Sequence, residues 1–305
     1  MTISLPQPQL PDPSAPQPVT RTARPPLVVV RDLPEVVRSP EPGRETAGTC
    51  VRIGPFDVLD RNEHDTVESI VEGALSVSTS TRAWITYALH VGGLNSRRDE
   101  TFVDAMSGAD LVYADGMSVV LLARLGGAEK IERCGTTDIG WGVLRRLSEE
   151  LGRPARVALI GGPDGLTRRA GDVLEAEAGV EVVLTENGYH DDWSAVLTRL
   201  ALSRCDVLFV GLGAPYEMKW VEENRHLLPP CLVMTCGGWF GFITEDEKRA
   251  PRWLCRVGLE WTYRLVQAPN RLWRRYAAGA LSTGLLALSM SVNRTAPDSE
   301  RAAIS

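Results

Sequence analysis

The sequence "DLVYADGMSVV" at residues 110–120 contains a carboxylate in a place where chemistry can be expected. The apolar run 111–114 predicts a short buried strand, and Asp115 follows it directly, with Gly116 behind it. A carboxylate there can take a proton from a hydroxyl group, as a general base does. It can equally cap a following helix, because Asp is favoured at helix N-caps. Position alone leaves both interpretations open.

Two glycine-rich turns, "LIGGPDG" (159–165) and "FVGLGAP" (209–215), each join a predicted strand to a predicted helix. Such glycines let backbone N–H groups approach a phosphate, although tight turns need glycine for geometry alone. Two of them in one sheet favour a nucleotide or nucleotide-sugar ligand. Neither turn fits the dinucleotide fingerprint or the Walker loop, which disfavours dinucleotides and ATP.

A basic and aromatic segment lies near the C-terminus. Residues 248–275 contain eight Lys or Arg against the single acid Glu260, interleaved with Trp and Tyr, and the run 276–293 has no charge. One interpretation is a basic helix packed on the core. The favoured one is a segment on an anionic membrane, with aromatic rings at headgroup level and arginines on phosphates. The uncharged run is borderline in length and composition for a span, so shallow insertion is preferred.

Composition limits the class of protein. The chain has 305 residues, is 44% hydrophobic and has a net charge of −6, which argues against general nucleic-acid binding. Its six cysteines show no metal-ligand spacing, so we expect reduced thiols in a cytoplasmic protein and no metal. Residues 1–27 contain no apolar run, so no signal peptide is expected.

Short apolar strands alternate with amphipathic helices from about residue 51, where "VRIGPFDVLD" predicts a strand pair or a strand followed by a turn. Further strands are predicted at 83–89, 110–114, 155–160, 180–184, 206–210 and 231–235. The alternation predicts a Rossmann-like α/β fold, a parallel sheet with helices on both faces. Ligands bind beyond the carboxyl ends of strands in such sheets, which places Asp115 and the glycine turns at one edge.

The chain is predicted to have four parts. They are a disordered proline-rich segment (1–48), an α/β core (49–255), a basic, aromatic helical appendage that associates with membranes (256–293) and a disordered tail (294–305).

Several stretches together point to a family. They are "ADLVYADGMSVV" (109–120), "RCGTTDIG" (133–140), "LIGG" (159–162), "LFVGLGAPYEMKW" (208–220), "RAPRW" (249–253) and "GLEWTYRLVQAPNRLWRRY" (258–276). With these, the chain resembles the WecG/TagA/CpsF glycosyltransferases, glycosyltransferase family 26, from about Val51 to Tyr276.

The resemblance implies an inverting, metal-independent and cofactor-free transfer of a sugar, N-acetylmannosamine or a related hexose. The donor is a UDP-sugar and the acceptor is a saccharide on undecaprenyl diphosphate, in cell-surface polysaccharide synthesis. Asp115 is the implied base, assisted by Thr86. The resemblance also implies that the enzyme acts at the inner face of the cell membrane. It leaves open whether the protein forms a homo-oligomer.

The binding residues fall into two sets. Those expected at the donor are Gly116, Arg133, Asp138, Gly161, Gly162, Gly211, Gly213, Pro215, Glu217, Gly237 and Gly238. Arg133 and Asp138 either hold the nucleotide or only pair with each other. Those implied at the acceptor diphosphate are Arg264, Arg271, Arg274 and Arg275.

The chain departs from the family pattern near the expected donor. The usual Asn is Ala88, the usual Lys–Gln–Glu is Tyr216–Glu217–Met218, and Gly241 replaces an Asp. We expect Glu217 to contact a sugar hydroxyl or a uracil N–H, and Trp239 to reshape the pocket or stack on a ligand. These changes leave the donor sugar open. They also motivate the alternative of a catalytically degenerate homologue that binds lipid-linked glycan or partner enzymes.

Overall fold

The computed structural model describes residues 49–77 and 80–246, together with positions 263, 265, 279, 283, 284, 286 and 287. The segments predicted as disordered, 1–48 and 294–305, lie outside the described residues. Most of the predicted appendage 256–293 lies outside them as well.

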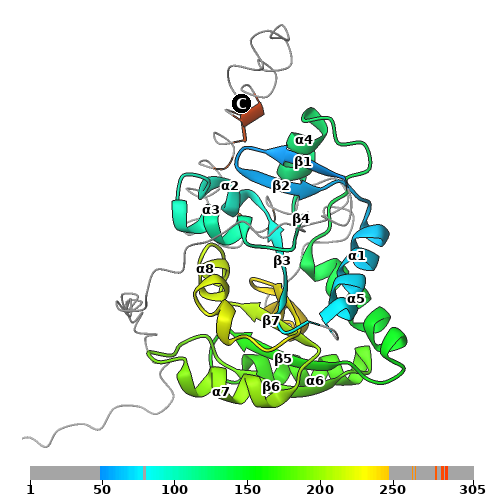
Figure 1. Ribbon diagram of the computed structural model, residues 1–305, viewed down its shortest axis with the longest axis vertical. Coiled ribbons are helices and arrows are strands. Elements are labelled where there is room, and N and C mark those ends of the chain that lie inside the picture. Colours follow the sequence, from blue (N-terminus) through cyan, green and yellow to red (C-terminus); the bar gives the residue numbers. More distant parts are fainter. Residues whose placement is uncertain are drawn as a thin grey trace, which may run out of the picture. The chain divides into compact units, whose positions relative to one another are not determined.

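A six-stranded parallel sheet forms the centre of the described chain (Figure 1). Its strands are β3 (Trp84–Leu89), β4 (Leu111–Ala114), β5 (Arg156–Gly161), β6 (Glu181–Glu186), β7 (Val207–Gly211) and β8 (Leu232–Thr235). They lie in the order β4-β3-β8-β7-β5-β6, and every neighbouring pair is parallel. This arrangement confirms the predicted parallel α/β sheet. Strands that are apolar throughout, such as β7, are stable only when both faces of the sheet are covered.

Four helices cover one face of this sheet: α1 (Glu63–Ser76), α5 (Thr136–Leu151), α6 (Leu166–Ala178) and α9 (Trp239–Ile243). Local chemistry sets where they begin and end. Asn62 caps α1 by accepting a hydrogen bond from the amide of Asp65 at 2.8 Å. Helices α5 and α6 end at Gly152 and Gly179, whose left-handed backbone stops a helix without strain.

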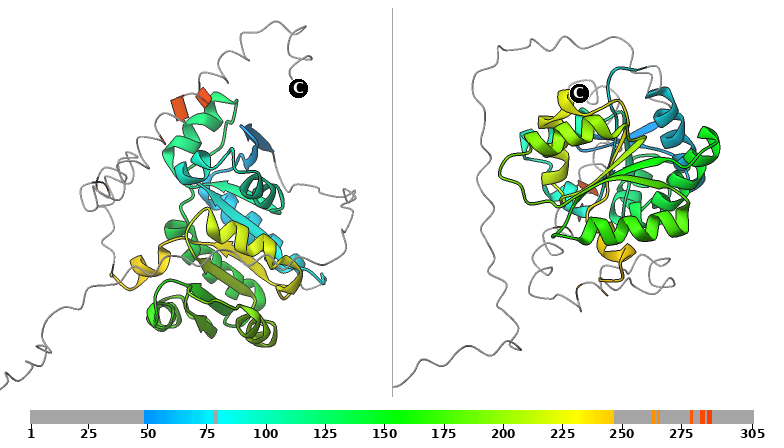
Figure 2. Two further views of the ribbon diagram at one scale, coloured as in Figure 1. Left: turned by 90° about the vertical axis from the view of Figure 1, so that its left-hand side faces the viewer. Right: turned by 90° about the horizontal axis from the view of Figure 1, so that it is seen from below.

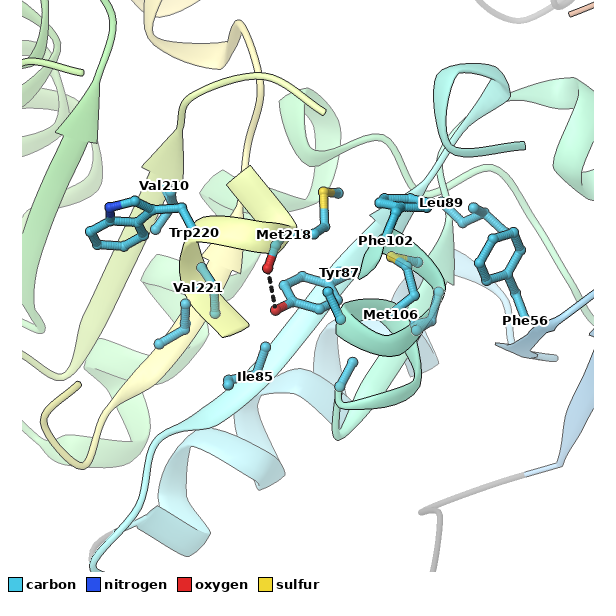
Figure 3. Packing of buried hydrophobic residues seen from close by; sticks show 14 of the residues in the cluster. Phe56, Ile85, Tyr87, Leu89, Phe102, Met106, Val210, Met218, Trp220 and Val221 are labelled. Carbon is cyan, nitrogen blue, oxygen red and sulfur yellow. Dashed lines mark hydrogen bonds between the residues drawn. The ribbon is translucent and has the colours of Figure 1, made fainter. Parts of the chain in front are cut away.

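The other face is covered by α2 (Val91–Asn95), α3 (Glu100–Ser107), α7 (Ser194–Ser203) and α8 (Tyr216–Glu223), with the 3-10 turn Arg225–Leu227 after α8. Figure 3 shows Tyr87 of β3 beneath α8, among buried apolar side chains. The Tyr87 hydroxyl donates to the carbonyl of Met218 at 3.4 Å. This packing holds the first turn of α8 above the sheet.

An antiparallel hairpin, β1 (Cys50–Ile53) with β2 (Phe56–Leu59), precedes the sheet, so the strand pair is the correct one of the two predicted alternatives. The hairpin packs against α4 (Met117–Leu125), and its β2 strand lies beside β4. The ring of Phe56 meets Phe102 of α3 edge to face at 5.9 Å. Figure 1 shows α4 beside the hairpin, and the left view of Figure 2 agrees with this. The helix that follows Asp115, α4, is therefore packed against the hairpin, which is not part of the six-stranded sheet.

Register aligns the carboxyl ends of the strands. Leu89 lies opposite Ala114, Val210 opposite Thr235, and Gly161 opposite Gly211. The turns after β4, β5, β7 and β8 therefore leave the sheet at one edge, where the sequence placed the site.

Candidate active site

Asp115 is half-buried at the end of β4. Its peptide N–H donates to the carbonyl of Leu89 at 2.8 Å, so the chain still follows β3 at this point. Gly116, with φ 121°, then turns the chain into α4. The N-cap residue of α4 is Gly116, which makes no side-chain cap hydrogen bond. The interpretation of Asp115 as a helix cap is therefore wrong.

Three charged side chains meet around Gly135, the N-cap residue of α5. A Cβ atom on Gly135 would lie 3.0 Å from Nη1 of Arg133, 3.1 Å from Oδ1 of Asp115 and 3.2 Å from Oδ2 of Asp138. Arg133 also donates to Asp138 at 2.6 Å. The amide of Cys134 donates to the carbonyl of Ala114 at 2.8 Å and fixes this segment to β4. The structure thus brings Arg133 and Asp138 to Asp115.

The glycine turns after β5, β7 and β8 meet closely. A Cβ atom on Gly161, whose φ is 144°, would lie 2.3 Å from the carbonyl oxygen of Gly211. One on Gly211 would lie 2.9 Å from the carbonyl oxygen of Gly237. The carbonyl of Gly162 accepts a hydrogen bond from Gly188, in the turn after β6, at 2.8 Å. Glycine is needed here so that three strand ends can come together.

Glu217, in the first turn of α8 after the N-cap Pro215, is only 2% exposed. Its Oε2 atom accepts hydrogen bonds from the amides of Gly213 at 2.9 Å and Gly237 at 3.1 Å. Burial raises the pKa of Glu217 to about 7; these amides lower it in part and the charge of Asp115 raises it further. The sequence predicted that Glu217 contacts the donor. In the structure its carboxylate instead accepts hydrogen bonds from the backbone amides of two loops.

Thr86 does not lie next to Asp115. It is 0% exposed and lies opposite Leu111 in the register, whereas Leu89 is the β3 residue beside Asp115. Its hydroxyl has no hydrogen-bond partner among the residues that the structure describes. The sequence suggested that Thr86 lies near the strand end, but β3 continues for three residues beyond it.

Trp239 lies in the core, on α9, which follows Gly237 and Gly238. Its ring is 4.8 Å from that of Phe209 and 6.1 Å from that of Trp141. Because Trp239 is only 2% exposed, its ring is not available to stack on a ligand in this structure. The ring packs against other aromatic side chains of the core instead.

A buried polar chain beneath the site was not predicted. The hydroxyls of Tyr113 and Thr136 are 2.6 Å apart, and Thr136 donates to the carbonyl of Thr235 at 3.4 Å. These contacts join β4, α5 and β8 under Asp115. A hydroxyl inside an otherwise apolar strand is the signal that could have revealed it.

The four predicted acceptor arginines, Arg264, Arg271, Arg274 and Arg275, lie outside the described residues. Within 49–77, 80–246 and the seven isolated positions, no group of three or more His, Cys, Asp or Glu side chains is placed to hold a metal ion. In the same described part of the chain, no helix combines the length and apolar character needed to cross a bilayer.

Comparison with known proteins identifies the family. The model of the "Glycosyl transferase WecG/TagA/CpsF family" matches residues 51–297. Two relatives are named N-acetylglucosaminyldiphosphoundecaprenol N-acetyl-β-D-mannosaminyltransferase. The one from Bacillus subtilis strain 168 is 29% identical over 58% of this chain and 68% of its own. The one from Bacillus spizizenii is 29% identical over 60% of this chain and 70% of its own.

The family match covers most of the chain, including Asp115, the glycine turns and the basic C-terminal segment. The chain belongs to the WecG/TagA/CpsF family and is a glycosyltransferase.

Proposed function

We propose that this enzyme transfers a hexose of the N-acetylmannosamine type, with inversion, from a UDP-sugar to a saccharide linked to undecaprenyl diphosphate. The observation that carries the proposal is the half-buried carboxylate of Asp115 at the carboxyl edge of the sheet, next to Arg133 and Asp138. The named activity of the two Bacillus relatives supports the acceptor class.

The chemistry follows from this placement. Asp115 takes the proton of the acceptor hydroxyl, whose oxygen forms a bond to the anomeric carbon of the donor. The bond from that carbon to the diphosphate breaks, and UDP leaves with its electron pair. A single displacement inverts the anomeric centre. In this proposal the charge of the leaving diphosphate is met by Arg133, held by Asp138, and by backbone amides of the glycine turns, without a metal or cofactor.

One observation favours the alternative of a binding protein without catalysis. The amides of Gly213 and Gly237, which a diphosphate would use, already donate to Glu217. Purified enzyme is tested with several UDP-sugars and a short-chain prenyl-diphosphate N-acetylglucosamine. We expect UDP release that requires the acceptor, and a disaccharide product by mass spectrometry. Acceptor binding without turnover on any donor would instead establish the alternative.

We also propose that the basic segment holds the acceptor diphosphate at the inner face of the cell membrane. Leu286 and Ala287, in the uncharged run 276–293 that follows the basic residues, pack on the core cluster that includes the hairpin, and Leu286 lies near Gly54. This run therefore reaches the hairpin that packs against α4, the helix after Asp115.

Replacing Arg271 or Arg275 with Ala is expected to raise the acceptor KM by about 10- to 150-fold, because a hydrogen bond to a charged group contributes about 1.5–3 kcal/mol. The donor KM should not change. Initial rates with each substrate varied in turn measure both constants. Arg168→Ala, on the exposed surface of α6, is the control. An equal rise in both KM values would place these arginines elsewhere.

A further inference from the structure

Glu217 joins two loops through one atom. Its Oε2 accepts the amide of Gly213 from the loop between β7 and α8, and the amide of Gly237 from the loop between β8 and α9. Both loops leave the carboxyl edge of the sheet. Because Glu217 is 2% exposed and its helix packs on β3, this link lies inside the protein, behind the edge that carries Asp115.

The surroundings of Glu217 do not favour a negative charge. Burial of a carboxylate is costly unless partners compensate it. Among the residues that the structure describes, Asp115 after β4, Cys236 after β8 and Tyr87 of β3 interact electrostatically with Glu217. All three are acids, and the contacts that favour the charged form of Glu217 are hydrogen bonds from backbone amides. The carboxyl group therefore titrates near neutral pH, at a pKa of about 7.

We propose that Glu217 is a positioning residue that ties these two loops together, and that its proton decides how well they receive an anionic donor. The proposal rests on the proposed function, because it takes the donor to be a nucleoside diphosphate sugar bound at this edge.

Two effects act in the same direction. An ionised Glu217 holds both amides and repels a diphosphate nearby. A protonated Glu217 is a weaker acceptor and carries no charge, so the amides of Gly213 and Gly237 can turn to the phosphate oxygens. Donor binding should therefore take up a proton at pH values above 7.

The experiment compares the full-length wild type with Glu217→Gln. Gln keeps one carbonyl oxygen for both amides but does not titrate. Glu72→Gln, on the exposed side of α1, is the matched control. Binding of UDP-N-acetylmannosamine, whose diphosphate has no titrating proton near neutral pH, is measured by calorimetry from pH 6 to 9. Two buffers of different ionisation enthalpy report the protons exchanged.

In the wild type and Glu72→Gln, affinity should fall by up to about tenfold per pH unit above pH 7, with proton uptake. In Glu217→Gln both effects should disappear while binding persists. The same pH dependence in Glu217→Gln, or no binding by the wild type, would overturn the coupling.

Thermal unfolding tests the loop link without any donor or turnover. The folded pKa is raised from 4.5 to about 7, so the stability that Glu217 contributes is present below pH 4.5 and is lost as the pH rises through about 7. The Tm of Glu217→Gln should exceed that of the wild type by more at pH 8 than at pH 5. Glu217→Ala, which leaves both amides without an acceptor, should fall below the wild type at either pH. A constant difference between Glu217→Gln and the wild type would contradict the buried titration, whatever the transfer assay shows.

Discussion

Asp115→Asn is expected to lower kcat for sugar transfer by about 10²–10⁴-fold, the range that a positioned general base contributes. The variant keeps the size of the side chain but cannot take the acceptor proton. Because it also removes a negative charge beside Arg133, the donor should bind at least as tightly as before. Steady-state rates with saturating donor and acceptor, together with donor binding by calorimetry, measure the two effects separately.

Asp104→Asn is the matched control, because Asp104 is an exposed residue of α3. It should leave both constants unchanged. If Asp115→Asn retained kcat within about tenfold of the wild type, below the range for a lost base, Asp115 would not be the base. Loss of donor binding together with kcat would instead assign Asp115 to the donor.

Gly161→Ala is expected to destabilise the fold by about 2–6 kcal/mol, the sum of overpacking and of backbone strain at about 1–3 kcal/mol each. The added Cβ would lie 2.3 Å from a backbone oxygen of Gly211, so a strand end has to move. The φ of 144° is one that only glycine adopts readily. Urea unfolding followed by circular dichroism measures the loss.

Gly152→Ala separates the two causes. Gly152 has φ 63° at the end of α5, and a Cβ atom there would meet nothing within 4 Å. Gly152→Ala should lower the free energy of unfolding by only about 1–2 kcal/mol, the penalty for a left-handed non-glycine residue. If both variants lost the same free energy of unfolding, the close approach of β5 and β7 would not contribute to the effect of Gly161→Ala.

The local patterns of the sequence were sufficient to predict the arrangement of strands and helices in the core. Apolar strands of four to six residues, each followed by an amphipathic helix, have one main way to bury both faces, which is a parallel sheet between helices. The same logic placed Asp115 and the glycine turns at one edge, since all carboxyl ends of a parallel sheet point the same way. The basic segment and the Asp–Gly turn carried the family resemblance, and the family match confirms it.

What surrounds each side chain depends on register and packing between distant segments, which no local pattern contains. The length of β3 beyond Thr86 separates that residue from Asp115. The turn of α9 onto Phe209 takes Trp239 into the core. Glu217 lies between two loops because α8 packs on β3 through Met218 and Tyr87. The residue types and their edge of the sheet came from the sequence, whereas tertiary contacts decided which carboxylate is half-buried beside Arg133 and which is enclosed.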